Sequence, residues 1–185
     1  MEAFSYLSVL LSIILGLAVQ QVLQGYRALI LSRGRITFYA PPLVWSVLPL
    51  MVAQHWWASF GLASLGEWSF ALFATVLVMA ALIYMMAAIV LPDVPATEKL
   101  DLRDHYYRER PAFFGLGAAT IVWSLVREYM LYGSLPEAAN LVFHLLFLAM
   151  ALTAALVGRP RVHELFAAAM TMLFVAYIAL LFARL

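Results

Sequence analysis

The sequence predicts an all-α, polytopic membrane protein folded as a bundle of six transmembrane helices. Its mean hydropathy is +0.95, 66% of its 185 residues are hydrophobic and only 11% are charged. A soluble domain could not bury so much apolar surface. Each apolar stretch is close to the roughly 20 residues that a helix needs to cross the hydrocarbon core. These stretches cover about 3–26, 41–63, 69–91, 111–133, 138–157 and 163–183, and their short connections predict one transmembrane domain over residues 1–185.

The first stretch carries small and polar residues at a spacing of four, namely Ser8, Ser12, Gly16, Gln20 and Gln24. Such a row forms one seam on a helix, which suits close packing against another helix or the wall of a pore. Amides that face lipid are costly, so we expect them to face protein or water. Gln20, Gln21 and Gln24 are therefore predicted to line an inner vestibule.

Polar residues in three other stretches are predicted to form an outer site. At about 1.5 Å of rise per residue they fall in the same half of the membrane, and the two histidines lie at nearly equal depth. The helix over 41–63 is also expected to kink at Pro49. The residues of this outer site are Gln54, His55, Arg127, Glu128, Asn140 and His144.

Two interpretations of the outer site stay open. Intramembrane ionisable residues are functional candidates, so the cluster indicates an ion or proton pathway in which Glu128 and a histidine titrate. A purely structural polar clasp that holds the bundle explains the same residues.

The stretches 69–91 and 163–183 are nearly free of polar side chains and are interpreted as packing or lipid-facing helices.

The segment over 97–110 is predicted to be a short amphipathic helix at the inner membrane interface, because its charges alternate in sign beside a modest apolar side. Asp101, Asp104, His105 and Glu109 could line one face and bind a cation, although an ordinary salt-bridged surface explains them as well.

The positive-inside rule predicts the orientation. Three connections on one side hold nine basic residues, and the connections 62–68 and 134–137 hold only Glu67 and Glu137. Both termini are therefore expected on the periplasmic or outer side, with the first helix retained. Three crossings per half would orient the halves oppositely, so a 3+3 inverted repeat is also considered. The nine basic residues are Arg27, Arg33, Arg35, Lys99, Arg103, Arg108, Arg110, Arg159 and Arg161.

Composition excludes several classes of protein. The chain has no cysteine, which excludes disulfides and thiolate chemistry, and Lys99, its one lysine, lies outside the apolar stretches, which excludes a retinal Schiff base. The net charge is +1 without a basic patch, so nucleic acid is not an expected partner. An enzyme is not predicted, because no arrangement of nucleophile, base or paired carboxylates has recognisable spacing. His55, His144 and Glu128 have the ligand types for zinc or iron, but no metal site is predicted from their spacing.

The function predicted is a small channel or transporter for an ion or proton without a cofactor, and a homo-oligomer is expected because six helices enclose little pore. One alternative is an electron-transfer protein that holds haem b between His55 and His144. The other is a non-catalytic subunit that assembles with a membrane-protein partner.

Three segments together resemble an uncharacterised family of small bacterial multi-pass integral membrane proteins. They are the opening run from Phe4 to Ala18, the pair Trp56-Trp57, and Asp101-Leu102-Arg103 followed by Tyr106-Tyr107. The resemblance implies a bacterial origin, and hence an inner-membrane location, but no activity.

Overall fold

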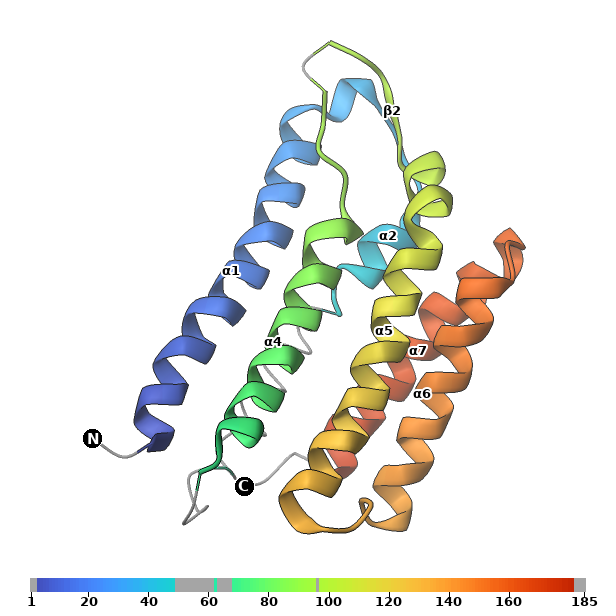
Figure 1. The fold of residues 1–185 in the computed structure, drawn as a ribbon. Coiled ribbons are helices and arrows are strands. Elements are labelled where there is room, and N and C mark those ends of the chain that lie inside the picture. Colours follow the sequence, from blue (N-terminus) through green and yellow to red (C-terminus); the bar gives the residue numbers. More distant parts are fainter. Residues whose placement is uncertain (1–2, 49–61, 63–67, 96, 182–185) are drawn as a thin grey trace.

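The computed structural model describes residues 3–48, 62, 68–95 and 97–181, and most of this part of the chain forms long helices (Figure 1). Within it, α1, α4, α6 and α7 are long and apolar enough to cross a membrane. The elements are α1 (Ala3–Leu31), the 3-10 turn η1 (Arg33–Arg35), β1 (Ile36–Thr37), α2 (Ala40–Trp45), α4 (Phe70–Val90), β2 (Leu100–Asp101), α5 (Leu102–Tyr132), α6 (Ala138–Leu156) and α7 (Pro160–Leu181).

The mainly helical class and the apolar helices agree with the sequence-based prediction, whereas the count of six crossings is not settled by the four apolar helices. The helix expected over 41–63 begins as α2, with Pro41 in its first turn. Residues 49–61 lie outside the described residues, and Gln54 and His55 lie there with them.

Helix α5 begins earlier than expected. The segment over 102–110 is not a separate interface helix but the first turns of α5, and residues 100–101 form β2. The Asp101 carboxylate accepts a hydrogen bond from the backbone N–H of Arg103 at 2.7 Å, which caps the helix start. Pro111 lies inside the helix without ending it. Gly133 ends α5 in the left-handed conformation, with φ at 68°.

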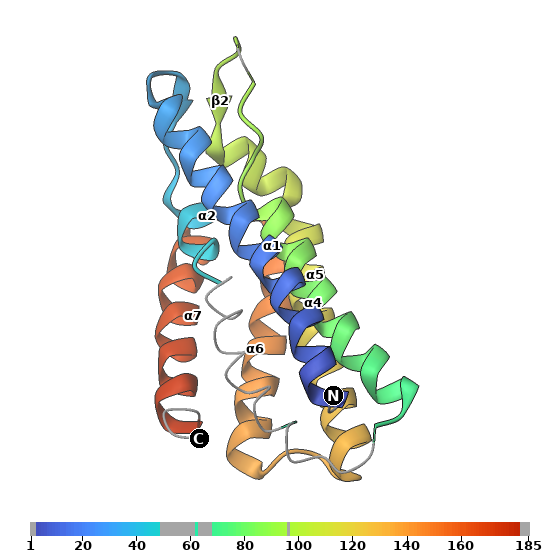
Figure 2. The ribbon, with the colours of Figure 1, turned by 90° about the vertical axis from the view of Figure 1, so that its left-hand side faces the viewer.

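Among the long helices, α1, α4 and α6 run in one direction, and α5 and α7 run in the opposite direction (Figure 1). In Figures 1 and 2, α1 and α4 run side by side, and α5 packs between α4 and α6. Helix α7 packs on α6 and α2. The connections near 32–39, 91–101 and 157–159 lie at one end, while α1 begins and α7 ends at the other. The parallel pair β1–β2 joins the first two of these connections.

Helix α1 packs mainly on α4 through a single apolar face. Leu7, Leu11, Leu15, Ala18 and Val22 recur at three or four residues and are all buried. They meet the buried face of α4, which joins them in one hydrophobic core. Tyr26 of α1 also bonds to the backbone oxygen of Leu43, whereas Ser12, Gly16, Gln20 and Gln24 on the opposite side are exposed.

Candidate functional site

A cavity of about 280 Å³ lies among α4, α5, α6 and α7. Its lining on α5 extends from Phe113 to Tyr132, so the cavity follows most of the length of this helix. Methionine, isoleucine and aromatic side chains form much of its wall. Polar groups concentrate toward the end of the bundle where α5 passes into α6, and they include Ser124, Arg127, Glu128, Asn140, His144 and Tyr177.

Helical periodicity brings the polar residues of α5 to this cavity. Ser124, Arg127 and Glu128 are three or four residues apart and therefore share one face of the helix. The short connection after Gly133 then reverses the chain, so the first turns of α6 lie beside the last turns of α5. This reversal places Asn140 and His144 against the same cavity.

His144 is buried, with 7% of its surface exposed, and both of its ring nitrogens are hydrogen-bonded. Nδ1 lies 2.9 Å from the backbone oxygen of Asn140, one turn earlier in α6. A carbonyl oxygen only accepts, so Nδ1 carries the proton. Nε2 lies 3.1 Å from Oγ of Ser124, and in the neutral ring it accepts the hydroxyl proton. His144 therefore links α6 to α5.

Arg127 and Asn140 each leave a polar atom without a partner at this site. Nε of Arg127 and Oδ1 of Asn140 are buried and have no hydrogen bond within the described part of the chain. Among all the described residues, the only ion pair joins Arg108 to Glu109. Arg127 and Glu128 therefore form no ion pair with a described residue. Of the predicted outer site, the structure brings together Arg127, Glu128, Asn140 and His144.

Aromatic rings line the cavity toward the opposite end of the bundle. Trp45 of α2 is 2% exposed, and its ring meets Phe114 edge-on at a centroid distance of 4.8 Å. Phe113 packs against both rings. The cavity thus has a polar end and an aromatic end.

Ser124 and Tyr177 were missed by the sequence analysis. A serine in an apolar helix is typical of a packing residue. Only the spacing of four between Ser124 and Glu128 indicated that the two residues share one face of the helix. Tyr177 belongs to the stretch that was interpreted as apolar, but it is buried against the ring of His144 at a centroid distance of 6.2 Å.

A second polar cluster joins α5 and α7 near the other end of the bundle. His163 is fully buried, and its Nε2 donates to the backbone oxygen of Val157 at 2.6 Å. Nδ1 must then accept, and Oη of Tyr106 donates to it at 2.7 Å. Burial raises the pKa of Tyr106 well above its ordinary value, which keeps the phenol a donor. His163 was not among the predicted site residues.

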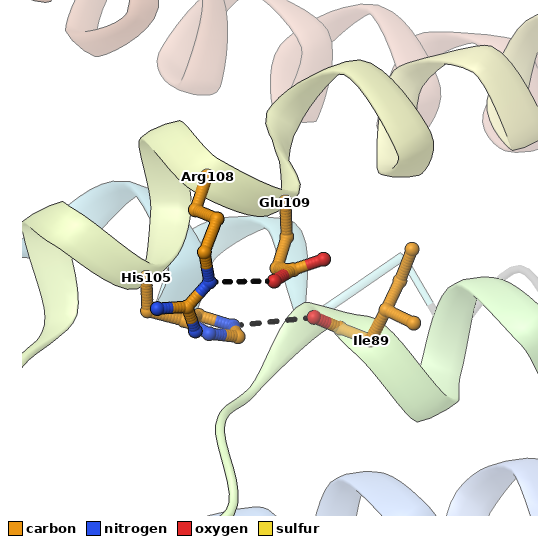
Figure 3. Close-up of polar contacts among 4 residues, drawn as sticks. All are labelled: Ile89, His105, Arg108 and Glu109. Atoms are coloured by element: carbon orange, nitrogen blue, oxygen red, sulfur yellow. Dashed lines mark hydrogen bonds and ion pairs between the residues drawn. The ribbon is translucent and has the colours of Figure 1, made fainter.

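The connection between α4 and α5 is fixed by His105 (Figure 3). Its Nε2 donates to the backbone oxygen of Ile89 at 3.2 Å, while Arg108 and Glu109 form an ion pair at 2.9 Å. Among the described residues no group of three His, Asp or Glu side chains could hold a metal ion. The observed contacts are those of a structural connection.

The predicted vestibule residues do not line this cavity. Gln20 and Gln24 are exposed on the outside of α1, and only Gln21 has a partner, donating to Oη of Tyr84 at 3.3 Å. Whether they border a vestibule stays a prediction. So does the haem alternative, because His55 lies outside the described residues and both nitrogens of His144 already have partners.

No protein-family model, curated protein or solved structure matches this chain. The resemblance to small bacterial membrane proteins therefore stays a prediction. The fold alone defines a class: four long apolar helices suggest a membrane protein.

Proposed function

We propose that the protein is a small transporter or channel for an ion or proton in the bacterial inner membrane, with its solute site at the polar end of the cavity. The observation that carries the proposal is the pair of buried polar atoms without partners, Nε of Arg127 and Oδ1 of Asn140. Leaving such an atom unsatisfied costs about 1–3 kcal/mol, and more for a charged group. A bound ion or polar solute would offset this cost.

The proposed topology has six crossings. Helix α5 lies alongside α4 and α6 over most of its length, so it would be a crossing if they are. The stretch over 41–63 would be another crossing. The basic connections share one end of the molecule, which would be cytoplasmic by the positive-inside rule. The polar end of the cavity would then lie in the outer half of the membrane.

The chemistry of the site favours a charged solute that moves with a proton. The guanidinium of Arg127 can donate to an anion, and Glu128 and His144 can each take up or release a proton. A proton that enters the cavity together with an anion would leave the net charge of the site unchanged, so the two would bind more strongly together than apart. The aromatic end favours a carrier over a permanently open channel.

Flux through proteoliposomes tests the proposal. Wild-type protein should move protons or a small ion, measured with a pH-sensitive dye and with chloride, sodium and potassium in turn. Loss of a hydrogen bond to a charged group costs about 1.5–3 kcal/mol, so Arg127→Gln and Glu128→Gln should each lower flux roughly tenfold or more.

Glu137→Gln is the matched control, because Glu137 is exposed at the same end of the bundle and does not line the cavity. Arg161→Gln, also at an exposed residue, serves the same purpose for Arg127. Wild-type protein without flux of any of these ions would overturn the proposal and favour the non-catalytic partner subunit. Equal losses in the variants and their controls would reject the site.

A further inference from the structure

The face of α1 opposite to α4 carries an exposed polar row. Ser12, Gly16, Gln20 and Gln24 follow one another at a spacing of four, and all four are exposed. Ala28 continues the same spacing. A Cβ atom built on Gly16 would meet nothing within 4 Å, so the surface there is open. Helix α1 itself lies at the outside of the molecule (Figure 2).

The two amides of this row lie in the middle part of α1, a helix long and apolar enough to cross a membrane. The midpoint of α1 is near Leu17, so Gln20 lies about 5 Å and Gln24 about 10 Å from it along the axis. Both fall within the roughly 15 Å half-thickness of the hydrocarbon core. Neither side chain has a hydrogen-bond partner among the described residues, whereas the neighbouring Gln21 bonds to Tyr84. Lipid offers an amide no partner, so this face needs a covering protein surface.

We propose that this face of α1 binds the same face of α1 in a second copy of the chain, in parallel orientation. A two-fold axis along the membrane normal places each residue of the row against its own copy. An amide both donates and accepts, so Gln20 can bond to Gln20 across the axis. Lone charges could not be paired in this way, and the row contains none. The row is thus chemically complementary to itself.

The shape of the row suits the same arrangement. Small residues at a spacing of four let two helix backbones approach closely in a right-handed crossing. Gly16 supplies the point of approach, and the exposed side chains of Ile13 and Leu17 flank it. At a spacing of four, the residue that follows Gln24 in the row is Ala28. Arg27 comes one residue before Ala28, so its charge lies to the side of the contact. The pairing is independent of the proposed transport function.

Cysteine cross-linking in native membranes tests the pairing, because the chain has no cysteine of its own. Equivalent residues meet in a parallel pair, so Gly16→Cys and Gln20→Cys should each form a disulfide-linked dimer under mild oxidation. Val142→Cys is the control, because Val142 is 54% exposed on α6, away from α1. A strong dimer band for the two α1 variants and a weak one for Val142→Cys is expected. Equal bands for all three, no dimer, or cross-linking only to another protein would overturn the proposal.

A second measurement uses the mass of the purified protein in detergent. The wild type should have a protein mass of twice 20.6 kDa by light scattering. Gly16→Leu should be monomeric because its side chain blocks the approach, and Gln20→Leu should dimerise roughly tenfold more weakly. Gly115→Leu is the matched control, since Gly115 on α5 is also exposed and open. A monomeric wild type, or a dimer that survives Gly16→Leu, would contradict the pairing.

Discussion

At the residue scale, two buried histidines fasten helices to one another, each through one backbone carbonyl and one hydroxyl. His144 joins α6 to Ser124 of α5, and His163 joins α7 to Tyr106 of α5. In both, the carbonyl fixes which nitrogen carries the proton, so the other nitrogen can accept. Removing the hydroxyl therefore leaves a buried acceptor without its donor.

Tyr106→Phe should destabilise the protein by about 1–3 kcal/mol, because Nδ1 of the fully buried His163 loses its only described donor. The expected result is a lower midpoint of thermal unfolding in detergent. Tyr129→Phe is the control, since Tyr129 is 60% exposed on the same helix. Equal midpoints for the two variants would show that the Tyr106–His163 bond does not stabilise the fold.

His105 should make the protein less stable in acid. Burial lowers its pKa below the ordinary value, and the nearby Glu109 opposes this only in part. Because the unfolded chain takes up the proton at a higher pH than the folded one, stability is complete above about pH 6.5 and falls as the pH decreases. Protonation would also place a proton on the buried Nδ1, which has no partner among the described residues.

The variant His105→Gln tests this dependence, because the amide can still donate to the backbone oxygen of Ile89 but does not titrate. Thermal unfolding at pH 7.5 and pH 5.0 should show a smaller loss of stability in the variant than in the wild type. The comparison of the two losses removes the contribution of the other histidines. An identical pH dependence would mean that His105 is protonated equally in the folded and unfolded chain.

The sequence located part of the candidate site but not its full membership. Depth follows from residue counting along a helix, which is why Arg127, Glu128, Asn140 and His144 could be grouped. The rotation of a helix about its axis can be predicted only when the helix has one polar and one apolar face. These helices are apolar almost all round. Whether Ser124 and Tyr177 face the cavity depends on this rotation, so only the structure could place them in the candidate site.

At the element scale, a close contact between segments depends on a glycine, which has no side chain, at the point of approach. Gly25 lies where α1 passes Leu91, just after α4, and a Cβ atom built there would come within 2.7 Å of Cβ of Leu91. That atom is fixed to the backbone and cannot rotate away. The position therefore requires glycine for a packing reason and not for a special backbone angle.

Gly25→Ala should destabilise the protein by about 1–3 kcal/mol, the usual cost of overpacking a tight contact. Gly115→Ala adds the same methyl group inside α5 where nothing lies within 4 Å. This control should be neutral or stabilising by up to about 1 kcal/mol, since alanine favours a helix over glycine. Urea or thermal unfolding in detergent distinguishes them, and a Gly25→Ala variant as stable as the control would refute the contact.

Helix boundaries show which elements a sequence can predict. The ends of α4 and α6 were predicted to within about one residue, because turn-forming residues interrupt uniformly apolar runs there. The start of α5 was misplaced, since Pro111 and the change from charged to apolar residues suggested a boundary. One missing N–H does not end a helix whose next turns pack well: Leu102, Tyr106 and Phe114 are all buried. Packing by these side chains outweighed the local signal.

At the scale of the whole molecule, the proposed topology makes a prediction about the two ends of the bundle. The connection between α4 and α5 and the one between α5 and α6 lie at opposite ends (Figure 1). If α5 crosses the membrane, these two connections face different compartments. The crossing needs a test because α5 carries Arg127 and Glu128 and is less apolar than its neighbours. In the proposed topology, Lys99 of the first connection and the arginines at the start of α5 would place that connection in the cytoplasm by the positive-inside rule.

Single cysteines in this cysteine-free chain test that topology with a membrane-impermeant maleimide. Ser134→Cys, in the exposed connection after α5, should react in intact cells or right-side-out vesicles. Asp93→Cys, in the exposed connection before it, should react only after the membrane is opened or inverted. Reaction of both residues from the same side would mean that α5 does not cross. The reverse pattern would keep the crossing but invert the orientation, and would place Arg127 and His144 in the inner half of the membrane.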